Sequence, residues 1–567
     1  MKKLLSTILA VAMILLMFAG CGNAATSEAA EQSASASAAA EAAEAPEPDA
    51  EDDAQPEEAS AAEPEEAEAS VEDLPEAEFD IYGPFSDEEV VLTYWKLWPP
   101  FLEGYDPMDA SLFATLYDAL NVRVDVTTVG TDSADTKFNL MVASGDYLDL
   151  LENADSNYPG GGTKAIQDEV LIDMMPYMQV YAPDYWAMLQ KDEVAMKTAI
   201  DSAGQMSYMV TLYDEIPVPQ SGLWTRKDWL EEQGLDAPST LEDMENLLQI
   251  FKDEYGCTDA FALRDTCEVP VRNVYGAYDW SVQDGQVTCG YLDTPDAMKD
   301  YLRKGHEWYE KGFYSSAFAT ANDTTSPKSQ LVVDGKSGIF DADILIVSEV
   351  ATIDPSITLT AVAPITKNAD DKLPAAWAST MNGANKCSVS SNCEIPEMAV
   401  AYINYAFTDE AYMAVNWGIE GETYTMVDGE PVFTDLMLNN PNLPASFTPL
   451  AYISPGFPFQ KSYAMTLSSY SDPAQVACYD IFSSKIDESL PKTDFPRDFV
   501  SFSTEESETI ANYQSDIETY ITECLAKFIT GDMDVDQDYE EFAATVESLG
   551  AREIQTIYQA AYDRFAG

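Results

Sequence analysis

Histidine is almost missing from this chain, because its 567 residues include only one, His306. A Ser/His/Asp triad needs a histidine at one defined place, and a histidine-rich metal site needs several. A single histidine cannot supply both, so catalysis that depends on histidine is disfavoured.

Basic residues are also scarce. The chain has 29 Lys plus Arg against 100 Asp plus Glu, which gives a formal net charge of −71. A nucleic-acid-binding protein needs a basic face that neutralises phosphates, so this class is excluded. Hydrophobic residues make up 46% of the chain, which is enough for ordinary cores, and the length fits roughly three to four domains.

Cysteines are few, and no two of them form a CxxC pair, so zinc is disfavoured. Cys257 with Cys267, or Cys387 with Cys393, are close enough in sequence to form disulfides, and buried free thiols fit equally well. The alternating acids at 532–538 lack the glycine and the final glutamate of a calcium loop. We expect no metal and no cofactor.

The N-terminus indicates export. Lys2 and Lys3 precede an apolar run, Leu4 to Phe18, which has the length of a signal-peptide core. The run ends in Phe18-Ala19-Gly20-Cys21, which resembles the lipobox of bacterial lipoproteins. The resemblance implies that residues 1–20 are a signal peptide and that Cys21 is diacylated; the alternative is an unmodified cysteine. Lipidation would hold the protein on the extracellular face of the cytoplasmic membrane.

Residues 21–85 differ in composition from the rest of the chain. Between Gly22 and Asp80 there are 20 acidic residues and no Lys or Arg, and Ala, Ser and Pro dominate what remains. Low hydrophobicity and like-charge repulsion favour a disordered, extended stalk.

From about residue 88 the pattern is that of an α/β protein with largely parallel sheets, in which short β-rich runs alternate with amphipathic helices. The expected strands are Val90–Trp95, Val122–Val129, Leu148–Glu152 and Ser207–Leu212. The expected helices are Leu112–Leu120, Ala134–Ala143, Arg226–Gln233, Leu241–Tyr255, Pro295–Lys311, Pro396–Asn404, Glu410–Trp417 and Tyr539–Leu549.

Several segments carry a family resemblance. Ser144-Gly145-Asp146-Tyr147-Leu148-Asp149, Arg226-Lys227-Asp228-Trp229-Leu230 and Gly418-Ile419-Glu420-Gly421-Glu422-Thr423-Tyr424, together with Lys527-Phe528-Ile529-Thr530-Gly531, follow one another as in the family 1 extracellular solute-binding lipoproteins of ABC importers. The chain resembles the long-chain, oligosaccharide-type branch from about Val90 to its end.

This resemblance implies a type II periplasmic-binding-protein fold, in which two discontinuous α/β lobes close on a solute held in the cleft between them. The expected first lobe is 86–220 with 375–425, and the second is 221–374 with 426–567, so the chain would cross between lobes near 220, 375 and 425. The protein would be a monomer that delivers its solute to the permease subunits of an ABC importer.

Candidate ligand-binding residues follow from their position at strand ends and in loops, where α/β proteins bind ligands. Flat aromatic rings stack on sugar rings, and polar side chains bind hydroxyl groups. The aromatic candidates are Trp95, Trp98, Tyr158, Trp280, Trp377 and Tyr424, and the polar candidates are Arg226 and Glu420. For each of them, packing or helix capping is the alternative role.

The expected solute is a neutral oligosaccharide. Outside the signal peptide and stalk, 27 basic residues face 80 acidic ones without a dense basic cluster, which disfavours anionic sugars. We expect a binding protein and not an enzyme. A carbohydrate-active hydrolase remains an alternative, because two carboxylates suffice for glycoside hydrolysis. A surface glycan adhesin or sensor is a second alternative.

Overall fold

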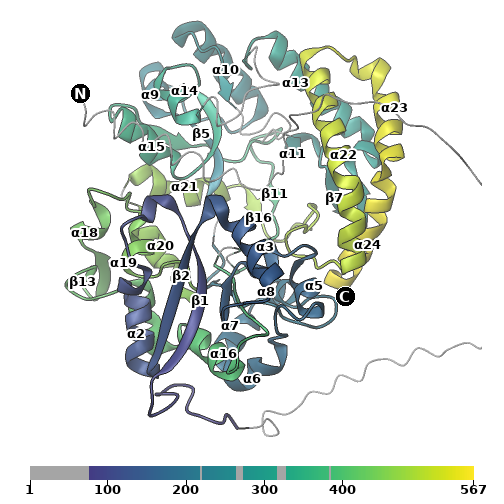
Figure 1. Cartoon of the computed structure of the whole chain (residues 1–567). Coiled ribbons are helices and arrows are strands. Elements are labelled where there is room, and N and C mark those ends of the chain that lie inside the picture. Colours follow the sequence, from purple (N-terminus) through teal and green to yellow (C-terminus); the bar gives the residue numbers. More distant parts are fainter. Residues whose placement is uncertain are drawn as a thin grey trace, which may run out of the picture. The chain divides into compact units, whose positions relative to one another are not determined.

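The computed structural model describes residues 76–217, 220–262, 272–315, 327–381, 383, 385–470 and 472–567. The predicted signal peptide, Cys21 and most of the predicted stalk lie outside these residues. The described part contains two four-stranded sheets with helices packed around them (Figure 1). None of the helices described is both long and apolar enough to cross a membrane.

The first sheet has the strand order β12-β3-β1-β2. Its strands are β1 (Val90–Trp98), β2 (Val122–Gly130), β3 (Leu150–Glu152) and β12 (Cys387–Val389). β1 is parallel to β2 and β3, whereas β12 is antiparallel to β3. The crossovers contain α2 (Ser111–Leu120) and α3 (Ala134–Ser144), as the alternating pattern predicted. β1 continues to Trp98 instead of ending at Trp95.

The second sheet has the order β10-β5-β9-β6, and it is mixed, not largely parallel as the sequence suggested. Its strands are β5 (Ser221–Arg226), β6 (Phe261–Ala262), β9 (Ile339–Asp343) and β10 (Leu359–Ala361). β5 runs antiparallel to β9 and β10. The helices α9 (Lys227–Gln233), α10 (Leu241–Tyr255), α14 (Lys328–Val333) and α15 (Ile346–Ile353) belong to the same part of the chain.

The two sheets have separate hydrophobic cores, which we call the cores of the first and second lobes. In the first lobe, Leu92 and Tyr94 of β1 pack in one cluster with side chains of α16 (Pro396–Tyr405) and α17 (Asp409–Asn416). In the second lobe, three C-terminal helices share a core with α13 (Pro295–Glu310). These helices are α22 (Thr504–Thr530), α23 (Val535–Val546) and α24 (Arg552–Ala566), which lie side by side in Figure 1.

The chain passes between the lobes through short strands that pair with one another. β4 (Leu212–Tyr213) is parallel to β15 (Gln460–Lys461), and β11 (Leu373–Pro374) is parallel to β16 (Ile486–Asp487). The segment between β4 and β5 is one passage, and the segment from β10 through β11 to β12 is another.

The third passage lies elsewhere than the sequence suggested. A crossing near 425 would put all of 426–567 in the second lobe, but Phe433, Met437 and Phe457 are buried in the core of the first lobe. The passage therefore follows β15. The hydrophobic pattern of this region could not reveal the difference, because it fits packing in either core.

Shorter elements connect these parts. They are α4 (Ala154–Asn157), α5 (Gly161–Gln167), α6 (Met178–Tyr181), α7 (Pro183–Leu189), α8 (Glu193–Ala199), α11 (Arg272–Tyr275), α12 (Gly290–Asp293), α18 (Asp435–Leu438), α19 (Thr448–Tyr452), α20 (Tyr463–Ser468) and α21 (Pro473–Ser483). Two antiparallel hairpins are formed by β7 (Trp280–Gln283) with β8 (Gln286–Cys289) and by β13 (Tyr424–Val427) with β14 (Glu430–Phe433).

The cysteines in the described residues are free and buried. Cys387 and Cys393 therefore do not form the disulfide that the sequence left open, and Cys267 lies outside the described residues. Burial raises the pKa of the Cys393 thiol to about 12, so this thiol is unreactive at neutral pH.

Candidate functional site

Polar side chains gather at the edge of the first sheet where the parallel strands end. β1 ends at Trp98, β2 at Gly130 and β3 at Glu152, and β12, being antiparallel to β3, begins at the same edge. We call this the carboxyl edge. Open α/β sheets bind their ligands at such edges, because loops and helix starts bring polar groups together there.

A buried ion pair lies at the carboxyl edge. Lys96 of β1 donates from Nζ to Glu152 Oε2 at 2.7 Å and to the carbonyl oxygen of Gly456 at 3.1 Å. The Leu97 amide also donates to Glu152 Oε2. Burial raises the pKa of Glu152, and its bonds to Lys96 and Leu97 oppose that rise. The pair ties two strands to the segment before β15, so it positions the edge.

Position 456 requires a glycine. Its φ is +76°, and a Cβ there would lie 3.0 Å from both Lys96 Nζ and Asn385 Oδ1. A side chain would therefore be strained and would press on the buried ion pair. Polar atoms of Asn385, Lys96 and Glu152 thus all lie around the position of Gly456.

A second ion pair lies beside the first. Lys386 donates from Nζ to Asp155 Oδ2 at 2.6 Å, and its ammonium lies 4.4 Å from the centroid of the Tyr208 ring. Asn153 holds this segment through its backbone, because its amide donates to the Lys386 carbonyl at 3.0 Å. Asn153 has a φ of 52°, in the left-handed region that asparagine tolerates.

Two polar atoms of α4 have no hydrogen-bond partner among the described residues. They are Asp155 Oδ1 and Asn157 Nδ2, both buried. A buried polar atom without a partner costs stability, and such atoms mark places where a ligand or water completes the bonding. One accepts a hydrogen bond and the other donates one, which is the pair of roles that a sugar hydroxyl can satisfy.

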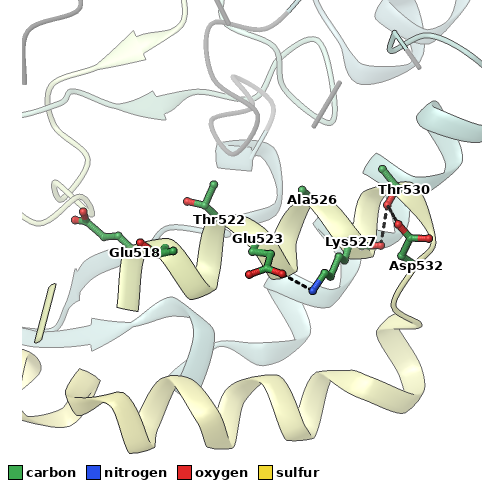
Figure 2. Close-up of a pocket in the computed structure, with 8 residues that line it drawn as sticks. Glu518, Thr522, Glu523, Ala526, Lys527, Thr530 and Asp532 are labelled. Atoms are coloured by element: carbon green, nitrogen blue, oxygen red, sulfur yellow. Dashed lines mark hydrogen bonds and ion pairs between the residues drawn. The ribbon is translucent and has the colours of Figure 1, made fainter. Parts of the chain in front are cut away.

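A surface hollow of about 660 Å³ lies along α22 (Figure 2). Lys527 pairs with Glu523 at 2.6 Å, and Thr530 Oγ1 donates to Asp532 at 3.2 Å. The residues that line it are Glu518, Thr519, Thr522, Glu523, Ala526, Lys527, Thr530 and Asp532. All of them come from α22 and the turn after it, so the hollow contains no group of the first lobe. We therefore place the candidate site at the carboxyl edge.

Two of the predicted aromatic residues lie at the carboxyl edge and are half-buried. Trp98 donates from Nε1 to the Leu102 carbonyl at 3.1 Å. Tyr158 follows α4 and donates its hydroxyl to Asp168 at 2.7 Å; burial, with help from this bond, raises the pKa of Tyr158 to about 12. Both rings retain accessible surface for a ligand.

Trp95, in contrast, is 4% exposed and packs edge-on against Phe138 at 5.6 Å between ring centroids. This differs from the expected stacking role, because both faces of β1 are covered. Arg226 is also enclosed: it pairs with Asp228, donates to the Val332 carbonyl and lies 4.1 Å from the Trp229 ring centroid. Its position fits the structural alternative.

The remaining candidates lie away from the carboxyl edge. Trp280 packs on Tyr558 of α24 at 4.9 Å, in the core of the second lobe. Trp377 lies in a passage between lobes, where its Nε1 donates to the Asp494 carbonyl at 2.9 Å. Tyr424 is buried at the base of a hairpin, and Glu420 is exposed just before it. The structure thus does not gather the eight predicted residues into one site.

Sequence reasoning missed Lys96, Glu152, Asp155 and Lys386. A signal for the first pair was present, because a lysine inside an apolar strand must find a charged partner when the strand is buried. Within the described ranges, no group of three or more His, Cys, Asp or Glu side chains is placed to hold a metal ion.

Comparison with known proteins gives no matching family profile. The chain is 25% identical to Lipoprotein LipO of Bacillus subtilis over 65% of its length and 74% of the relative. It is 22% identical to the polygalacturonan/rhamnogalacturonan-binding protein YtcQ of the same species, with coverage of 82% and 90%. It is 21% identical to the fructooligosaccharide ABC transporter substrate-binding protein FusA of Streptococcus pneumoniae, with coverage of 82% and 88%.

Solved structures show the same fold. An extracellular solute-binding protein from Bifidobacterium longum subsp. infantis superimposes with a TM-score of 0.67 at 17% identity, covering 85% of this chain and 100% of the other. The alginate-binding protein AlgQ2 without calcium gives 0.63 at 19% identity, with coverage of 86% and 100%. The chain therefore resembles binding proteins of ABC transporters in sequence and shares the fold of solved solute-binding proteins. The predicted two-lobed α/β fold is confirmed, the predicted family is supported by these relatives, and two of them, YtcQ and FusA, are named as binding proteins.

Proposed function

We propose that the protein captures a neutral oligosaccharide at the carboxyl edge and, after the second lobe closes on it, delivers it to the permease subunits of an ABC importer. A solute that contacts both lobes only in the closed state shifts the population toward that state. Asp155 Oδ1 and Asn157 Nδ2 carry the proposal, because hydroxyl groups of a sugar would supply the partners that these buried atoms lack.

The charges at the edge favour a neutral sugar over a uronate. A bound carboxylate needs a cation, but Lys96 is paired with Glu152 and Lys386 with Asp155. Burying a further negative charge beside these pairs would leave it without compensation. The names of the relatives include both a uronate polymer, polygalacturonan for YtcQ, and a neutral sugar, fructooligosaccharide for FusA. The relatives therefore do not decide between the two kinds of sugar, and the preference for a neutral sugar is supported by the pairing of Lys96 and Lys386 with acids.

Calorimetry with sugars of equal length tests this choice. We expect a neutral tetrasaccharide from a panel of fructans, glucans and mannans to bind at least tenfold more tightly than tetragalacturonate, a difference of about 1.4 kcal/mol. Asp155→Asn should reduce the difference in affinity between the neutral tetrasaccharide and tetragalacturonate, because it frees the Lys386 ammonium to pair with a carboxylate of the uronate. A uronate that binds wild type more tightly than every neutral sugar would contradict the proposal.

We also propose that Cys21, outside the described residues, carries the lipid that holds the protein on the extracellular face of the membrane. The lipobox-like sequence supports this, as does the resemblance to a lipoprotein. Cys21→Ser should move the protein from the membrane fraction to the soluble fraction after export, whereas Cys393→Ser, at a buried cysteine, should leave it with the membrane. Membrane retention of Cys21→Ser would exclude lipidation at this residue.

A further inference from the structure

Only the base of the β13–β14 hairpin packs in the core of the first lobe, and the rest of the hairpin is mostly exposed. At its base, Tyr424 and Phe433 pair across the two strands and are buried. Both rings pack on Trp417, with centroid distances of 6.4 Å and 4.9 Å. The base is therefore anchored, and the rest of the hairpin is free of the core.

Beyond this base the hairpin exposes apolar side chains. Met426, Val427 and Val432 are 46%, 51% and 42% exposed, and Ile419, just before the hairpin, is 50% exposed. Met426 and Val427 are consecutive, so they point to opposite faces of the ribbon. Within the described residues the hairpin has no third strand. Apolar side chains gathered on such a projection are typical of a contact surface for another molecule.

The surroundings of the hairpin carry one sign of charge. From Cys387 to Gln460 the sequence has nine acidic residues and no Lys or Arg. Four of these acids, all exposed, flank the apolar side chains: Glu420, Glu422, Asp428 and Glu430. This charge repels an anionic lipid surface, and a second copy of the chain would bring acids against acids. A complementary partner has an apolar surface with Lys and Arg at its rim.

We propose that the hairpin is a docking element for a permease subunit of the importer. Val427 and Val432, which share one face of the ribbon, form the apolar centre of the contact, Met426 on the opposite face lies at its margin, and the acids form its rim. This inference rests on the proposed function. It assigns the docking role to side chains that belong neither to the carboxyl edge nor to the core.

The test separates docking from sugar binding. The hairpin variant combines Met426→Thr, Val427→Thr and Val432→Thr, since threonine keeps the preference for strand. The matched control changes three exposed apolar residues elsewhere, Leu140→Gln, Ile353→Gln and Val476→Gln. Each sugar-loaded protein is titrated into phosphatidylcholine proteoliposomes that contain the permease and ATPase subunits of the importer, and ATP hydrolysis is measured.

The hairpin variant should need at least tenfold more protein than wild type for half-maximal stimulation, with an unchanged sugar Kd by calorimetry, and the control should match wild type. Asp428→Lys with Glu430→Lys should weaken stimulation in the same direction, and the difference from wild type should shrink as salt is added. Equal half-maximal concentrations for the hairpin variant and wild type would overturn the inference and leave the proposed function standing.

Other occupants give distinct results, each of which overturns the inference. A dimer that sediments in wild type and is lost in the hairpin variant would assign the surface to a second copy of the chain. Hairpin-dependent binding to phosphatidylglycerol vesicles without importer would assign it to lipid. If wild type binds sugar but stimulates no importer, the delivery step of the proposed function is itself refuted.

Discussion

Glu152→Gln should lower the free energy of unfolding by about 3 to 5 kcal/mol, because it leaves the Lys96 charge buried without its partner. Lys96 is 1% exposed, and Glu152 Oε2 accepts hydrogen bonds from both its ammonium and the Leu97 amide. Glutamine keeps nearly the same volume, so the loss would come from charge and not from a cavity. Urea unfolding at pH 7, followed by near-UV circular dichroism, measures the change.

Glu420→Gln is the matched control, because it makes the same chemical change at an exposed glutamate. Its unfolding free energy should stay within about 0.5 kcal/mol of wild type. The double variant Lys96→Met with Glu152→Gln should recover part of the loss, because it leaves no buried charge. Wild-type stability in Glu152→Gln alone would show that the Lys96 ammonium has another source of compensation.

The elements of the fold were predictable where local chemistry sets both ends. Helix α10 has the predicted bounds because Thr240 and Asp243 form a capping box at its start, and Gly256, with a φ of +71°, ends it. The parallel pairing of β1 with β2 and β3 was predictable, because these strands alternate in the sequence with helices long enough to connect parallel strands. These signals lie within a few residues of one another.

The lobe boundaries and the site depend on contacts distant in sequence. Lys96 meets the carbonyl of Gly456, and Asp155 meets Lys386, and no local pattern predicts either pairing. The run Tyr94-Trp95-Lys96 is buried throughout, because helices cover both faces of β1. The position of Trp95 and Trp98 near the end of a strand therefore could not show which of the two rings faces a ligand and which packs in a core.

Replacing Trp95 should therefore affect the free energy of unfolding, whereas replacing Trp98 should affect sugar affinity. Trp95→Ala should cost about 3 to 5 kcal/mol of unfolding free energy, because it removes a ring buried against Phe138 and leaves a cavity. Sugar affinity, measured well below the unfolding transition, should stay within about twofold of wild type.

Trp98→Ala should instead weaken sugar binding by about tenfold to a hundredfold, because a half-buried ring at the carboxyl edge can stack on a pyranose or furanose face. Trp98→Phe is the matched control: it keeps a ring and loses only the Nε1 bond to the Leu102 carbonyl, so most of the affinity should remain. Calorimetry and urea unfolding on the same three variants separate the two effects. If Trp98→Ala binds like wild type while Trp95→Ala loses affinity, the ligand contacts the face of the first sheet that carries Trp95 and not the face that carries Trp98.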